Sequence, residues 1–110
     1  EVVRVPREGK RLSLAAVLEE LHRRDVQSVY VEGGRAVAGS FLAAGVVDRV
    51  ECWIAPKIAG GGETHLGPVR LPVPNAQMKD ATNLHHTSIT QVGEDFLVEG
   101  WVTWHLFGKE

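Results

Sequence analysis

Hydrophobic positions in the first third of the chain follow the spacing of a helix and then that of a strand. Apolar residues occur at the i, i+3, i+4 and i+7 positions of a helix: Leu14, Val17, Leu18 and Leu21. Ser13 precedes them as an N-cap, and the polar run 23–25 ends the helix with two arginines that suit its negative dipole end. Residues 2–5 predict a short strand end, and the apolar, β-branched run 26–32 predicts a buried strand.

A second helix and a further strand are predicted in the middle of the chain. Val37, Phe41 and Leu42 share one helical face, and Gly45 is placed to end that helix as a left-handed cap. Residues 46–55 then predict a strand, which Pro56 ends. The order helix, strand, helix, strand favours an α/β layered domain with at least one right-handed parallel crossover.

The last part of the chain predicts a long loop and an antiparallel hairpin. Residues 57–76 are rich in Gly and Pro, whereas 83–92 and 95–106 are strand-like and meet at the turn 93–95. Apolar residues occupy both sides of the second strand: Phe96, Val98, Val102, Trp104 and Leu106 on one, Leu97 and Trp101 on the other. We therefore expect a sheet that is covered on both sides or buried in a dimer. The predicted core is thin, which indicates an incomplete domain.

The strongest chemical pattern is the junction between the strand at 26–32 and the second helix. Glu32 ends the strand, and Gly33 and Gly34 lead directly into the helix. A helix N-terminus presents backbone N–H groups and a positive dipole end to an anion, and glycines let the backbone approach a ligand closely. The pattern favours a nucleotide or sugar-phosphate site, although paired glycines also serve tight strand–helix packing. The spacing with Gly39 does not fit the G-x-G-x-x-G dinucleotide fingerprint.

Other candidate groups have simpler interpretations. Asp48 and Arg49 fit a catalytic pair or, more simply, a solvated turn before a strand. The run Gly60–Gly62, behind Lys57, fits a phosphate-cradling loop or a flexible loop or hinge. The histidines lack the spacing of a metal site, Cys52 suits a small core position, and the tryptophans suit packing or an interface. These residues are His65, His85, His86, Trp53, Trp101 and Trp104. We expect no metal.

Composition narrows the class of protein. The 110 residues are 44% hydrophobic and 24% charged, which is typical of one small globular domain. A net charge of −2, with no run of Lys and Arg, argues against nucleic acid as a partner. No apolar stretch is long enough to span a membrane. The single cysteine excludes an internal disulfide, so a reducing cytoplasm is expected.

An ordered series of segments resembles a known family. The segments are 31–34, 38–48, 54–57 and 60–62, and the resemblance runs from about Leu12 to Trp104. The series is similar to the C-terminal reductase domain of the bifunctional riboflavin-biosynthesis deaminase/reductase. The resemblance implies a dihydrofolate-reductase-like α/β fold, a mixed sheet flanked by helices that ends in an antiparallel hairpin.

The resemblance also implies an activity and a set of site residues. The activity is the NADPH-dependent reduction of 5-amino-6-(5-phosphoribosylamino)uracil to its ribitylamino product. The family's catalytic, substrate-contacting acid falls on Glu32, which would stabilise positive charge on an iminium-like transition state or orient a ribose hydroxyl. The cofactor contacts fall on Gly33, Gly34, Arg35, Ala36, Val37, Ala38, Gly39 and Ser40.

The chain also departs from the family pattern. The first half of the reductase domain and the zinc-binding elements of the deaminase have no counterpart here. We therefore expect residues 1–110 to be the C-terminal part of a single reductase domain, inactive alone, and to form a homodimer through the C-terminal strands. The alternatives are an inactive dimerisation or nucleotide-binding module of the same fold, or a relative that reduces another pteridine or pyrimidine.

Overall fold

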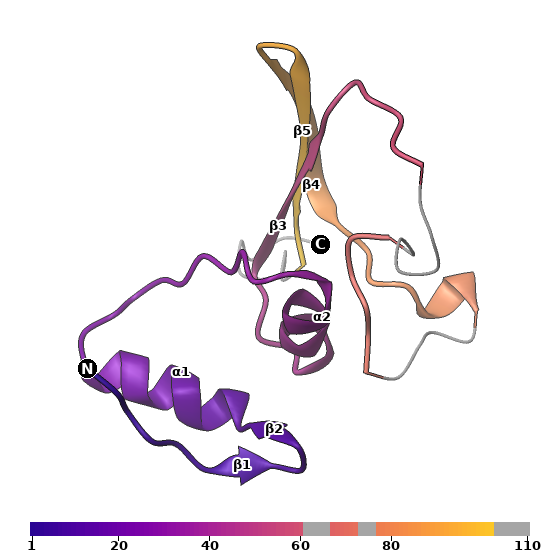
Figure 1. Cartoon of the computed structure of the whole chain (residues 1–110). Helices are drawn as coiled ribbons and strands as arrows, with labels where there is room; N and C mark the ends of the chain where they lie inside the picture. The colour runs from indigo at the N-terminus through magenta and orange to yellow at the C-terminus, as the bar shows by residue number, and fades with distance from the viewer. Residues whose placement is uncertain (61–66, 73–76, 103–110) are drawn as a thin grey trace. The chain divides into compact units, whose positions relative to one another are not determined.

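The computed structural model describes residues 1–60, 67–72 and 77–102, and its chain divides into two compact units. The first unit comprises Glu1–Gly33 and the second Gly34–Glu110. The first holds β1, β2 and α1, and the second holds α2 and a three-stranded sheet (Figure 1). The described residues combine two α-helices with a two-stranded and a three-stranded sheet, which confirms the predicted α/β class.

The first unit starts with a tight hairpin that leads into a capped helix. β1 (Arg7–Glu8) pairs antiparallel with β2 (Arg11–Leu12) across a turn in which Gly9 has φ of 66°. The Ser13 hydroxyl accepts a hydrogen bond from the Ala16 N–H at 3.2 Å, so α1 (Leu14–Arg23) begins where the sequence predicted. The strand predicted over 2–5 is wrong, because the turn at Gly9 pairs the residues next to it instead.

The segment after α1 does not form the predicted strand. Residues 26–32 lie outside both described sheets, and the side chains of Val29 and Tyr30 are 47% and 65% exposed. A strand is stabilised by the ladder of a neighbouring strand, and none of the described strands forms a ladder with this segment. The parallel crossover is therefore also wrong for the described residues, where every strand pair is antiparallel.

The second unit begins with a helix and continues into an antiparallel sheet. α2 (Arg35–Ala43) ends before Gly45, whose φ of 71° confirms the predicted left-handed cap. The sheet has the order β3-β5-β4, with β5 in the centre. Its strands are β3 (Arg49–Ile54), β4 (His85–Val92) and β5 (Asp95–Trp101), and a short 3₁₀ helix η1 (Met78–Asp80) precedes β4.

The C-terminal hairpin agrees with the sequence prediction over its described part. β4 and β5 pair in register from Val92–Asp95 to Ser88–Glu99, and Gly93 in the turn has φ of 61°. The strand predicted over 46–55 is confirmed with shorter bounds. Parts of the predicted loop and strand, 61–66, 73–76 and 103–106, lie outside the described residues.

A β-bulge interrupts the pairing of β4 with β5. The register shifts between His85 and Ser88, and His86 adopts a left-handed conformation with φ of 51°. Gly100 is buried opposite this bulge, and a Cβ there would lie 2.8 Å from the Leu84 Cβ and 3.0 Å from the Thr87 Cγ2. The close approach of β4 at the bulge therefore requires glycine in the central strand.

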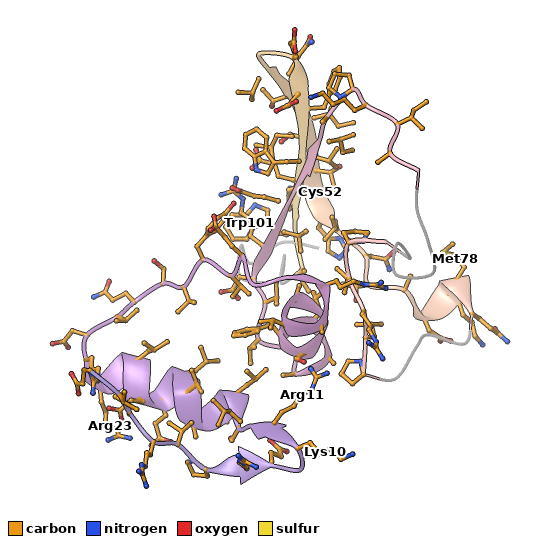
Figure 2. All side chains as sticks on the ribbon, in the orientation of Figure 1. Lys10, Arg11, Arg23, Cys52, Met78 and Trp101 are labelled. Atoms are coloured by element: carbon orange, nitrogen blue, oxygen red, sulfur yellow. The ribbon has the colours of Figure 1, made fainter. Side chains whose placement is uncertain are left out.

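The register divides the sheet into an apolar face and a polar face, because residues paired across strands point to the same side. The apolar face carries Val50, Cys52, Ile54, Ile89, Phe96 and Val98. The opposite face carries Arg49, Glu51, Ser88, Glu99 and Trp101, together with Trp53 and Leu97. Cys52 lies midway along the sheet in Figure 2.

The described residues contain no buried hydrophobic side chain. Only Gly39 and Gly100 are buried among them, and on the apolar face Ile54 and Ile89 are 48% and 72% exposed. The expectation of a thin core is thus confirmed. The expected cover on both faces of the sheet is absent from the described residues, since Trp53 on the other face is also 51% exposed.

Candidate functional site

Glu32 and Gly33 are the last described residues of the first unit. Both are exposed, and they lie in the extended segment that follows α1. An exposed carboxylate is accessible to a ligand from solvent. The structure describes Glu32 within its own unit, and its role as the catalytic acid stays a prediction.

Gly34 opens the second unit and acts as the N-cap of α2. Its φ of 85° and ψ of 169° fall in a backbone region that is essentially restricted to glycine. No described heavy atom lies within 4 Å of the position where a Cβ would be. The space beside this backbone is open, so another molecule can approach it closely.

The first turn of α2 has the geometry of an anion-binding helix start. The first intrahelical hydrogen bond joins the Ala38 N–H to the Gly34 carbonyl at 3.0 Å. The N–H groups of residues 35–37 precede that donor and lie at the positive end of the helix dipole. A helix start of this kind favours an anion, because it combines backbone N–H groups with a positive dipole end.

Further along α2, the predicted site residues take part in packing. Gly39 is buried, and a Cβ there would overlap the backbone carbonyl of Arg70. The Arg70 N–H donates a hydrogen bond to the Arg35 carbonyl at 2.9 Å. The Ser40 hydroxyl donates to the Ala36 carbonyl at 2.9 Å, one turn back in the same helix. Among the candidate cofactor residues, Gly34 therefore has open space beside it, whereas Arg35 and Gly39 contact the backbone of Arg70.

A second constellation, on the polar face of the sheet, was missed in the sequence. Arg49 forms ion pairs with Glu51, at 3.3 Å, and with Glu99, and its guanidinium lies 5.8 Å from the centre of the Trp101 ring. The Ser88 hydroxyl donates to Glu99 at 3.2 Å. Trp101, labelled in Figure 2, lies at the end of the sheet beside these charged side chains. These residues are called the Arg49 cluster below.

The Arg49 cluster borders an open hollow of about 280 Å³. Its lining residues are Arg49, His86, Ser88, Glu99, Gly100 and Trp101. Arg49 belongs to the strand predicted over 46–55, which is confirmed here, and not to a solvated turn before it, because the residue starts β3 and its side chain reaches Glu99 on β5. The alternation of Arg49 with Glu51 and of Glu99 with Trp101 was the available signal, but only the register shows that the two pairs face each other.

The Arg49 cluster makes a specific prediction about stability. Glu51 and Glu99 are directly opposed across β3 and β5, and Arg49 neutralises their repulsion. Arg49→Ala should lower the free energy of unfolding by about 1 kcal/mol, measured by urea denaturation at neutral pH and low salt. The double variant R49A/E99Q should recover most of that loss. If the single variant unfolds at the wild-type urea concentration, the cluster does not stabilise the sheet.

The remaining sequence predictions concern a metal site, the cysteine, a membrane span and residues outside the described ranges. No group of three or more His, Cys, Asp or Glu side chains that could hold a metal occurs among the described residues. Cys52 is half-buried on the apolar face of the sheet. Within the described part of the chain, no helix is both long and apolar enough to cross a membrane. His65, Gly61, Gly62 and Trp104 lie outside the described residues.

Comparison with known proteins identifies a family model and several relatives that match most of the chain. The family described as the RibD C-terminal domain matches residues 1–98. A riboflavin biosynthesis protein RibD from Bacillus amyloliquefaciens is 40% identical over 89 residues, which is 80% of this chain and 23% of the relative. The corresponding protein from Actinobacillus pleuropneumoniae is 34% identical over 93 residues, 83% of this chain and 24% of the relative.

A shorter relative carries a more specific name. The 2,5-diamino-6-ribosylamino-4(3H)-pyrimidinone 5′-phosphate reductase of Methanothermobacter thermautotrophicus is 34% identical over 93 residues, 82% of this chain and 41% of the relative. The chain thus spans about a quarter of the length of the RibD relatives and less than half of this reductase.

Proposed function

Because the chain belongs to the RibD C-terminal domain family, we propose that it forms part of an NADPH-dependent reductase of riboflavin biosynthesis. The substrate is 5-amino-6-(5-phosphoribosylamino)uracil, and the product carries a ribityl chain in place of the ribosyl group. The observation that carries the proposal is the open space beside Gly34, the N-cap of α2, which lies two residues after Glu32 in the sequence. The relative named as a ribosylamino-pyrimidinone phosphate reductase supports the substrate class.

Glu32 is the proposed catalytic residue. In the ring-opened sugar, the exocyclic nitrogen and the first ribose carbon form an imine. The imine nitrogen first takes a proton from water. When hydride adds to the carbon of the protonated imine, the C=N π electrons move to nitrogen, and a neutral secondary amine results. The protonated imine carries positive charge, and a fixed carboxylate stabilises that charge where water is excluded. The Glu32 carboxylate holds this position in the proposal and also contacts the substrate.

NADPH supplies the hydride when bound, and the chain supplies the position of its phosphates. Gly33 and Gly34 let the backbone approach the pyrophosphate, and the N–H groups at the start of α2 donate to its oxygens. Arg35 adds a cation at the same helix end. The donor set of this turn fits an anionic dinucleotide, since it combines N–H groups, a dipole end and a guanidinium.

A titration with NADPH tests the proposal on the protein as its gene encodes it. Binding is followed by the change in tryptophan fluorescence, and hydride transfer by the loss of NADPH absorbance with the phosphoribosylamino substrate. Binding together with substrate-dependent oxidation of NADPH supports the reductase. Binding without transfer favours the inactive nucleotide-binding module, and no binding overturns the cofactor site. The homodimer and the cytoplasmic location stay predictions.

A further inference from the structure

We infer that the contact between Gly39 and the backbone of Arg70 positions the first turn of α2 for its ligand. The inference rests on the proposed dinucleotide site and adds a part to it. That part is loop 67–72, a segment about thirty residues away in the sequence that carries none of the predicted site residues. Arg70 acts as a positioning residue through its backbone.

Two contacts hold loop 67–72 against the helix. The Arg70 N–H donates to the Arg35 carbonyl at 2.9 Å, in the first turn of α2. The Arg70 carbonyl lies against the Cα of Gly39, one turn later, so closely that any Cβ there would overlap it. One peptide segment thus contacts α2 at two successive turns on one side.

These contacts are unusual within this chain. Gly39 is one of only two buried residues among those described, and both are glycines approached by another backbone or strand. Elsewhere the described part of the second unit buries no hydrophobic side chain that could hold α2 in place. In the described part of the second unit, the backbone contact with loop 67–72 therefore contributes to the orientation of the helix start.

Glycine at position 39 is explained by this contact and not by local helix formation. Gly is a poorer helix former than Ala, and Gly39 lies in the interior of α2 with helical geometry. A residue that weakens the helix is tolerated here because the neighbouring carbonyl needs the space. In this interpretation Gly39 and Ser40 support the site from within the helix, and the ligand contacts are confined to residues 33–37.

A role of the contact in positioning the helix start and a role in stabilising the helix predict different effects on ligand binding. A ligand held by several N–H groups and a guanidinium requires that these groups keep their relative positions. In catalysis, a misplacement of about 1 Å can lower the reaction rate by about a hundredfold. Displacing loop 67–72 should therefore weaken dinucleotide binding even where the helix itself becomes more stable.

Two variants disturb the contact between Gly39 and Arg70, one from α2 and the other from loop 67–72. Gly39→Ala raises the intrinsic helix propensity but places a Cβ against the Arg70 carbonyl. Arg70→Pro removes the N–H that binds the Arg35 carbonyl. Each should raise the Kd for NADPH by about tenfold or more and raise KM for NADPH more than it lowers kcat.

A control variant separates positioning from helix stability. Ala43→Gly weakens α2 at its far end, where the side chain is exposed, and leaves the Gly39–Arg70 contact intact. It should bind NADPH with the wild-type Kd. Amide hydrogen exchange should increase in the first turn of α2 in the two test variants and not in the hairpin β4–β5.

Failure of the positioning inference can be distinguished from failure of the proposed function. If the wild-type protein binds no NADPH, the proposed function fails. If the wild-type protein binds and both test variants bind equally well, the positioning inference is wrong. The inference is also wrong if Ala43→Gly weakens binding as much as the test variants, or if both test variants lose the circular dichroism of the sheet, because the contact would then only stabilise the fold.

Discussion

Replacing Glu32 by Gln should lower the rate of hydride transfer by about 10²–10³-fold while the Kd for NADPH changes little. The reason is that Gln keeps the size of the side chain and its hydrogen-bonding oxygen but removes the negative charge. The positive charge of the protonated imine is present in the transition state and not in the dinucleotide. The measurement is single-turnover oxidation of NADPH with saturating phosphoribosylamino substrate, in the protein as its gene encodes it.

A matched control is available in the same unit. Glu19 is an exposed carboxylate on α1, so Glu19→Gln makes the same change of charge away from the proposed site. This variant should keep the wild-type rate. A Glu32→Gln enzyme with an unchanged rate would remove Glu32 from the chemistry, whereas a rise in substrate KM at constant kcat would support the alternative role in orienting a ribose hydroxyl.

The second large effect is expected for a substitution at Gly34, on the helix side of the Glu32–Gly34 junction. Gly34→Ala should lower the free energy of unfolding by about 1–3 kcal/mol, because φ of 85° with ψ of 169° is strained for any residue with a Cβ. Relief of that strain moves the start of α2, so the Kd for NADPH should rise by about tenfold, equivalent to about 1.4 kcal/mol. Urea denaturation and the fluorescence titration measure the two effects separately.

Gly45 provides the control for Gly34, because it also has a positive φ and lies at the opposite end of α2. Gly45→Ala should destabilise the protein by about 1–2 kcal/mol through its left-handed conformation, and NADPH should bind as in the wild type. Equal losses of binding in both variants would mean that the titration reports stability alone. Wild-type binding by Gly34→Ala would contradict the proposed role of the helix start.

Elements defined by local signals were predicted well. The Ser13 cap with the apolar spacing behind it located α1, and Gly45 located the end of α2. The hairpin β4–β5 followed from alternation on both sides of the turn at Gly93. In each case, residues within a few positions of one another determine both the backbone conformation and the hydrogen bonds that satisfy it.

Elements that depend on distant partners were predicted less well. The run 26–32 has the composition of a buried strand, yet the described residues provide no neighbouring strand for it. Arg49 has the local context of a turn, but its two carboxylate partners come from its own strand and from β5. The bulge at His86 and the glycine opposite it also depend on the fit between two strands.

The sequence by itself determined the helices, the terminal hairpin, the family and the position of the Glu32–Gly34 junction, because each depends on short-range patterns or on an ordered series of motifs. The tertiary structure alone decided which residues of that junction lie open and which are packed. The Arg70 carbonyl occupies the space beside Gly39, while the space beside Gly34 is open. Both residues are glycines in the same series, and only their spatial neighbours distinguish the packed position from the one proposed to bind a ligand.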